Sequence, residues 1–236
     1  MLRQDILQRF GQVLRLVLLG FVFLGLGVAS FSPLRAQSVT SEEEQRGVDI
    51  ATRFSKKMRA LKTFRAVVDF SIEHPQWKSP RSYNATLEAQ RPAFYFSGMG
   101  HEIYSDGVSR WQYIPAQKEV VVMRVDSTSL SPIENPLRLF SHLGTNFRIY
   151  FQGERTEGKE RYYDLSLYPH DLNAPYSQIH VALHQETLYP AKFSYIGRDG
   201  VNYVVSISSF SPNAKVRTNF ALDTKALKGV KVTDLR

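Results

Sequence analysis

His180 and His184, in the stretch "IHVALH", have the spacing that most suggests chemistry. Two histidines four residues apart on a helix can hold a metal ion on one face. Here Ile179, Val181 and Leu183 alternate with them, which predicts a strand. On a strand the two rings share a face but lie about 13 Å apart, too far for one ion to bridge. The other four histidines are isolated in the sequence, so we expect no metal site.

Other motifs for catalysis are missing from the sequence. It contains no cysteine, which excludes a disulfide scaffold, a thiolate metal site and a cysteine nucleophile. Gly98 and Gly100 fit a turn rather than a phosphate-binding loop, and no nucleophile elbow occurs. Residues 42–44 are three glutamates that read as a solvated helix lead-in. We therefore expect a protein that is not an enzyme and that needs no cofactor.

Residues 1–36 have the pattern of a secretory signal peptide. Three arginines precede an uncharged run of 14 residues at 16–29, and Ala36 offers a small residue for cleavage. A cut after Ser30 and an uncleaved membrane anchor are the alternatives, although 14 residues are short for a bilayer span. Without a cysteine the exported protein cannot itself be a lipoprotein. We expect it in the periplasm.

The charge of the chain gives only a weak indication of its partners. The net charge is +8, and it falls to +5 when the predicted signal peptide, with four Arg and one Asp, is removed. The basic residues are scattered and form no aromatic-basic groove, so we expect no nucleic-acid partner. The modest positive field favours anionic membranes or an acidic protein surface.

The remaining residues, 37–236, predict a single mainly β domain. Ser41 and Glu44 form a capping-box pattern that begins a helix ending near Leu61. From Phe64 the hydrophobic period changes from 3.6 to 2, and about ten or eleven short alternating strands follow, the last at 220–222. This pattern is typical of one large antiparallel sheet, curled into an unclosed β-barrel.

Residues 129–144 interrupt the strands with a mostly apolar, helical segment. Ser131 can cap it, Pro136 splits it, and Gly144 suits its C-terminal end. Together with the N-terminal helix, this segment is the candidate cover for the apolar face of the sheet. Either the sheet closes around packed side chains, or it leaves an apolar cavity under a short helical lid.

Several stretches, in order, resemble one family. They are "ALKTF", "RPAFYF", "YSDGVSRWQYIPAQKEV", "YPAKFSY", "NYVVSISSF" and "FALDTKALKGVKVTDLR". An Arg-Pro on an early strand, an "SDG…W.Y.P…V" hairpin and a C-terminal "F…KGV.V.D.R" resemble the periplasmic outer-membrane lipoprotein carrier family, LolA. The resemblance covers residues 45–236.

The resemblance implies a monomeric carrier that moves lipoproteins from the inner to the outer membrane. Its partners would be acylated lipoproteins, an inner-membrane lipoprotein-releasing ABC transporter complex and an outer-membrane acceptor. A different hypothesis is an envelope-stress sensor that uses the same half-barrel to bind stray lipid or peptide. Such relatives usually carry a second domain, for which no residues remain here.

The resemblance also implies site residues. Arg91 matches the family arginine that latches the lid by hydrogen bonds to backbone carbonyls, expected here within 131–143. A guanidinium suits this role because it has five donors and a permanent charge. The residues expected to line a lipid cavity are Phe70, Leu87, Phe94, Phe96, Trp111, Tyr113, Leu137, Leu139, Phe140 and Leu143.

Overall fold

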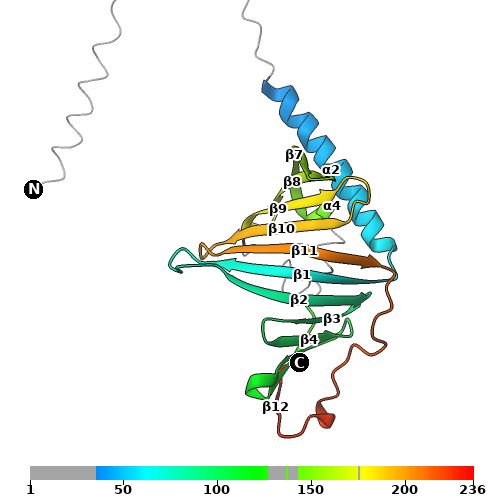
Figure 1. Ribbon diagram of the computed structural model, residues 1–236, viewed down its shortest axis with the longest axis vertical. Coiled ribbons are helices and arrows are strands. Elements are labelled where there is room, and N and C mark those ends of the chain that lie inside the picture. The colour runs from blue at the N-terminus through cyan, green and yellow to red at the C-terminus, as the bar shows by residue number, and fades with distance from the viewer. Residues whose placement is uncertain (1–35, 127–136, 138–142, 175) are drawn as a thin grey trace, which may run out of the picture. The chain divides into compact units, whose positions relative to one another are not determined.

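The computed structural model describes residues 36–126, 137, 143–174 and 176–236, shown as coloured ribbon in Figure 1. The predicted signal peptide lies outside these residues apart from Ala36. Among the described residues, no helix combines the length and the apolar character needed to span a bilayer.

The N-terminal helix, α2 (Ala36–Ala60), ends where the sequence predicts but begins earlier. The predicted start at Ser41 was wrong, because Ser41 lies within the helix. Between residues 36 and 46 there is no proline or glycine to end it. Its apolar stripe includes Phe54 and Met58, both fully buried.

The sheet has twelve strands, one more than the largest number expected. The strands are β1 (Thr63–Glu73), β2 (Arg81–Gln90), β3 (Ala93–Gly98), β4 (His101–Ser105), β5 (Ser109–Ile114), β6 (Glu119–Arg124), β7 (Phe147–Glu157), β8 (Glu160–Pro169), β9 (Tyr176–His184), β10 (Pro190–Gly197), β11 (Asn202–Pro212) and β12 (Lys231–Asp234). Short helices with described bounds are α4 (Leu143–Asn146), η1 (Pro115–Gln117) and η2 (Thr224–Ala226).

The strand order is β12-β6-β5-β4-β3-β2-β1-β11-β10-β9-β8-β7. Strands β1 to β6 form one antiparallel meander and β7 to β11 form a second, and the two meet where β1 pairs with β11. The sheet is open, with β12 and β7 at its edges, as expected for an unclosed barrel (Figure 1). The expectation of a wholly antiparallel sheet was wrong, because β12 runs parallel to β6.

The strand predicted at 220–222 is absent. Asn219 and Asp223 instead accept hydrogen bonds from the backbone amides two residues later, which favours local turns over a strand ladder. Leu222 and Leu227, from this C-terminal segment, pack against a small cluster around Trp111. The segment thus covers the face of β5 and β6 that carries Trp111.

Helix α2 crosses β7 in very close contact at Gly47. A Cβ atom at this position would lie 2.9 Å from the backbone nitrogen of Phe151 and 3.0 Å from the carbonyl oxygen of Ile149. Only glycine fits without a shift of the helix, since backbone atoms cannot move aside as a flexible side chain can. This approach fixes α2 against β7.

Tyr176 is fully buried in the core, with its ring centroid 5.4 Å from that of Tyr195 and 6.4 Å from that of Phe147. Burial, with a smaller contribution from Asp171, raises the pKa of Tyr176 to about 12. A tyrosine in the unfolded chain has a pKa of about 10 and therefore ionises first.

The raised pKa of Tyr176 predicts a loss of stability in alkali. Its contribution to the free energy of unfolding is complete below about pH 10 and is lost as the pH rises towards about 12. Urea unfolding at a series of alkaline pH values should show this decline, with a shallower slope for Tyr176→Phe. An equal slope in the two proteins would contradict the assignment to Tyr176. The pKa of Tyr195 is also raised by burial, so some slope should persist.

Candidate functional site

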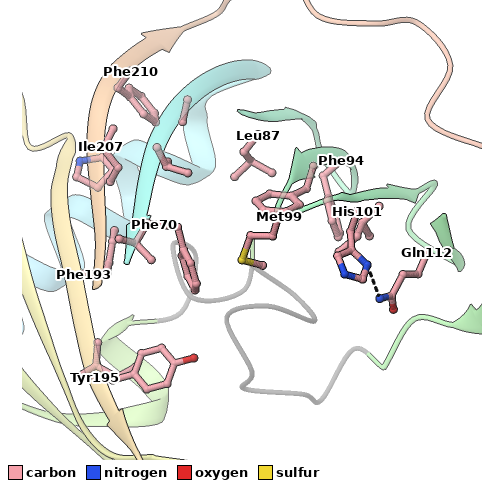
Figure 2. Close-up of a pocket in the computed structure, with 17 residues that line it drawn as sticks. Phe70, Leu87, Phe94, Met99, His101, Gln112, Phe193, Tyr195, Ile207 and Phe210 are labelled. Carbon is pink, nitrogen blue, oxygen red and sulfur yellow. Dashed lines mark hydrogen bonds between the residues drawn. The ribbon is translucent and has the colours of Figure 1, made fainter. Parts of the chain in front are cut away.

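A cavity of about 210 Å³ lies on the face of the sheet that α2 partly covers (Figure 2). Strands from both meanders line it, including β1, β2 and β3 from the first and β9, β10 and β11 from the second. The described lining residues are Ala66, Val68, Phe70, Leu87, Phe94, Phe96, Met99, His101, Ile103, Gln112, Ile179, Pro190, Phe193, Tyr195, Val205, Ile207 and Phe210.

The lining follows from strand alternation and register. Ala66, Val68 and Phe70 are every second residue of β1 and all point to the same face. The register places Phe70 opposite Val205, and Val205 opposite Phe193, so three neighbouring strands present adjacent apolar side chains. The seam between the two meanders therefore forms the middle of the cavity wall.

Helix α2 fills only part of the apolar face. Its buried residues Phe54 and Met58 belong to the same hydrophobic core as Phe147, Ile149 and Leu165 of β7 and β8. None of the α2 residues is among the described lining residues of the cavity. The face is therefore packed solid beside β7 and β8 and hollow over β1 to β3 and β10 to β11.

Four of the residues predicted to line a cavity do so. Phe70, Leu87, Phe94 and Phe96 are all in contact with it, and the first three are almost completely buried. Figure 2 shows Phe70, Leu87 and Phe94 around the open space. Their role in binding lipid stays a prediction.

The placement of Trp111 and Tyr113 at the cavity was wrong. Both belong to the cluster that the C-terminal segment covers, on the other face of the sheet. Gln112, between them in β5, lines the cavity instead. Alternation shows that Trp111 and Tyr113 share a face, but it does not show which face.

The lid residues are described only in part. Leu137 and Leu143 are buried in the main core and are not among the residues that line the cavity. Leu139 and Phe140 lie outside the described residues. The predicted helix end at Gly144 was wrong, since α4 continues to Asn146.

Arg91 lies in the two-residue turn between β2 and β3, where the Arg91–Pro92 peptide bond is cis. Its Nε and Nη2 atoms are buried, and desolvation, assisted by the charge of Arg59, lowers the pKa of Arg91. The segment expected to supply its carbonyl partners, 131–143, is described only at Leu137 and Leu143. The latch therefore stays a prediction.

The Arg-Pro and Ser-Asp-Gly motifs lie next to each other in space. Asp106 Oδ1 accepts hydrogen bonds from the amides of Val108, at 2.8 Å, and Ser109, at 2.7 Å, which closes the predicted turn. At Gly107, whose φ is +92°, a Cβ atom would lie 2.5 Å from Pro92 Cγ. The turn after β4 thus packs against the turn before β3, which explains why glycine is needed there.

The part of the lining that comes from the later strands was not predicted. Phe193 and Tyr195 of β10 and Val205 and Ile207 of β11 line the cavity. The alternation of these residues predicts the strands. No pattern within either strand predicts that β1 pairs with β11, and this pairing brings the residues beside Phe70. His101 and Gln112 were also missed, because a lone polar residue on a strand usually points to solvent.

His180 and His184 are on strand β9, as predicted. His180 Nδ1 lies 3.2 Å from Ser166 Oγ, and His184 Nδ1 lies 3.4 Å from a carboxylate oxygen of Glu160. Within the described part of the chain, no three His, Asp or Glu side chains gather closely enough to hold a metal ion.

The protein is an open, curved sheet with an apolar cavity on one face. Solved structures with a similar fold include a LolA superfamily protein and a lipoprotein-sorting protein domain. A LolA superfamily protein from Nitrosomonas europaea has 13% identity and a TM-score of 0.42, with 75% of this chain and 98% of that chain covered. An outer membrane lipoprotein-sorting protein domain from Vibrio parahaemolyticus has 15% identity and a TM-score of 0.43, with 75% and 96% covered.

A third similar structure is the MucA/MucB complex of Pseudomonas aeruginosa, at 16% identity and a TM-score of 0.38, with 73% of this chain and 59% of that chain covered. No family model matches the chain, and no curated protein matches it.

Proposed function

We propose that the protein binds acyl chains in the cavity and carries lipoproteins between the two membranes of the cell envelope. The observation that carries this proposal is the composition of the cavity wall. Of the 17 described lining residues, all but His101, Gln112 and Tyr195 have apolar side chains. A cavity of this composition is suited to a hydrocarbon chain.

The hydrophobic effect is large enough to hold such a ligand. Each CH₂ group removed from water contributes about 0.8 kcal/mol, so a chain of about fifteen methylenes contributes at most about 12 kcal/mol. This corresponds to roughly nanomolar binding of one chain. The lipid chains of a lipoprotein can then leave a bilayer and cross an aqueous compartment inside the protein.

A carrier also has to release what it binds. An element that occupies the cavity when it is empty reduces the net affinity, because its displacement costs free energy. We assign this role to the mostly apolar segment 129–144, and we assign the latch to Arg91. The N-terminal sequence and its predicted export support a periplasmic location.

The proposal also holds that the protein acts by binding and not by catalysis. The described lining residues include no serine, lysine, aspartate or glutamate, and His101, which could act as a general base, has Gln112 and not a nucleophile as its hydrogen-bond partner. The handover would pass from an inner-membrane releasing complex to an outer-membrane acceptor, as the family resemblance implies.

Mass spectrometry of the full-length protein, purified from its native envelope without detergent, tests the proposal. We expect an acylated protein or a lipid to co-purify in roughly stoichiometric amount, and we expect delipidated protein to bind an apolar fluorescent probe. A lipid-free preparation that binds no such probe would refute the proposal. A bound peptide without lipid would favour the sensor hypothesis.

A further inference from the structure

The three polar side chains of the cavity are unevenly placed. His101 on β4 and Gln112 on β5 lie together at one end of the lining, with Gln112 Nε2 3.2 Å from His101 Nδ1. Tyr195 on β10 lies at the opposite end, across β3, β2, β1 and β11 (Figure 2). The cavity wall between Tyr195 and the His101–Gln112 pair is apolar. The paired hydrogen-bonding groups therefore mark the β4–β5 end of the cavity.

The His101–Gln112 pair retains hydrogen-bonding capacity. The amide Nε2–H of Gln112 donates to His101 Nδ1, so the neutral imidazole carries its proton on Nε2. That Nε2–H, the second amide hydrogen and Gln112 Oε1 have no hydrogen-bond partner among the described residues. Both residues are half-buried and line the cavity together with Ile103 and Met99. A ligand that accepts a hydrogen bond can take the place of the water that these polar groups otherwise contact.

The chemistry of the pair favours a neutral acceptor. No Lys, Arg, Asp or Glu is among the described lining residues, so apart from the imidazole of His101 the described lining offers no charge to compensate a phosphate or a carboxylate. A carbonyl oxygen needs only one or two donors, which the pair supplies. The group that an acyl lipid presents at the head of its chain is an ester or amide carbonyl.

The length of the cavity wall, followed from strand to strand, fits a long chain. From β4 to β10 there are five steps between neighbouring strands, or roughly 24 Å measured along the sheet at about 4.8 Å per step. This is comparable with the extended length of a long acyl chain. A ligand with its carbonyl at His101 can therefore lay its chain over Phe94 and Phe70 towards Phe193.

We propose that the His101–Gln112 pair binds the ester or amide carbonyl of an acyl lipid and so selects acylated ligands over plain hydrocarbon or ether-linked chains. The inference rests on the proposed function and adds to it a specific recognition group. It also fixes the direction of the ligand, with the head at the β4–β5 end of the cavity and the tail at β10.

The test uses two ligands that differ only in the carbonyl, 1-palmitoylglycerol and 1-hexadecylglycerol, as competitors against an apolar fluorescent probe bound to the delipidated full chain. We expect the ester to bind about three- to tenfold more tightly than the ether, the value of one hydrogen bond. His101→Phe/Gln112→Leu should lose this preference and still bind the ether, and Gln112→Leu alone should reduce it. Tyr195→Phe, which removes a hydroxyl from the opposite end, is the matched control and should retain it.

Each other result overturns the inference. Equal affinity of the wild type for ester and ether would leave the carrier proposal standing and remove the role of the pair. A role of the pair would also be excluded by an ester preference that survives in His101→Phe/Gln112→Leu, or by one that Tyr195→Phe abolishes. Tighter binding of palmitate than of the ester would show that a charged head is preferred. If neither glycerol lipid displaces the probe, the inference and the proposed function both fail.

Discussion

Val205→Glu is expected to weaken binding of an acyl ligand by at least about a hundredfold, or roughly 2.7 kcal/mol. Val205 lies at the middle of the cavity wall, opposite Phe70 on β1 and Phe193 on β10. A carboxylate at this point would have to lose its hydration when a hydrocarbon chain enters, and no lysine or arginine is among the described lining residues to compensate it. Titration of delipidated protein with an apolar fluorescent probe measures the effect.

The adjacent residue provides the control. Ser206 follows Val205 in β11, points to the other face of the sheet and is not among the lining residues of the cavity. Ser206→Glu adds the same charge to the same strand and should leave probe binding within about twofold of the wild type. Equal loss of binding in both variants would indicate a general effect of the charge on the sheet, and equal retention would show that the cavity is not the binding site.

Phe54→Ala is expected to lower the free energy of unfolding by about 3–5 kcal/mol. The Phe54 side chain is completely buried in the core that joins α2 to the sheet, and its loss would leave a void that the fixed approach of α2 at Gly47 keeps from closing. Urea unfolding followed by circular dichroism gives the value. Lys56→Ala, an exposed change on the same helix, should alter it by less than about 0.5 kcal/mol. If Phe54→Ala also changed the free energy of unfolding by less than about 0.5 kcal/mol, α2 would not stabilise the sheet.

The local features of the fold were predictable because they depend on neighbours in sequence. Alternation from Phe64 onward identifies β1, and the turn residues Asp106 and Gly107 identify the β4–β5 hairpin. The parallel strand β12 was not predictable, since its four residues are mostly exposed and carry no alternating pattern of their own. Its pairing with β6 depends on a contact between residues more than a hundred positions apart.

The site was predictable only in part, for the same reason. Phe70 and Phe94 lie on strands whose apolar face is also the cavity face, so the pattern identifies them. Trp111 is different, because it lies on the opposite face of β5, which the C-terminal segment covers. An aromatic residue buried on that face has the same alternating sequence pattern as one that lines the cavity. His101 and Gln112 have no apolar pattern, and only the curvature of the sheet shows that they face inward.

The strand order has a consequence for how the chain reaches its native state. Strand β1 completes its pairing only with β11, and Phe64 lies opposite Pro212, so one edge of an early strand stays open while nearly 150 further residues are made. An open edge of this kind is a template for incorrect pairing with other chains. The slow step of folding should therefore be the long-range joining of two preformed meanders, and crowded nascent chains would need a holdase until the last strands emerge.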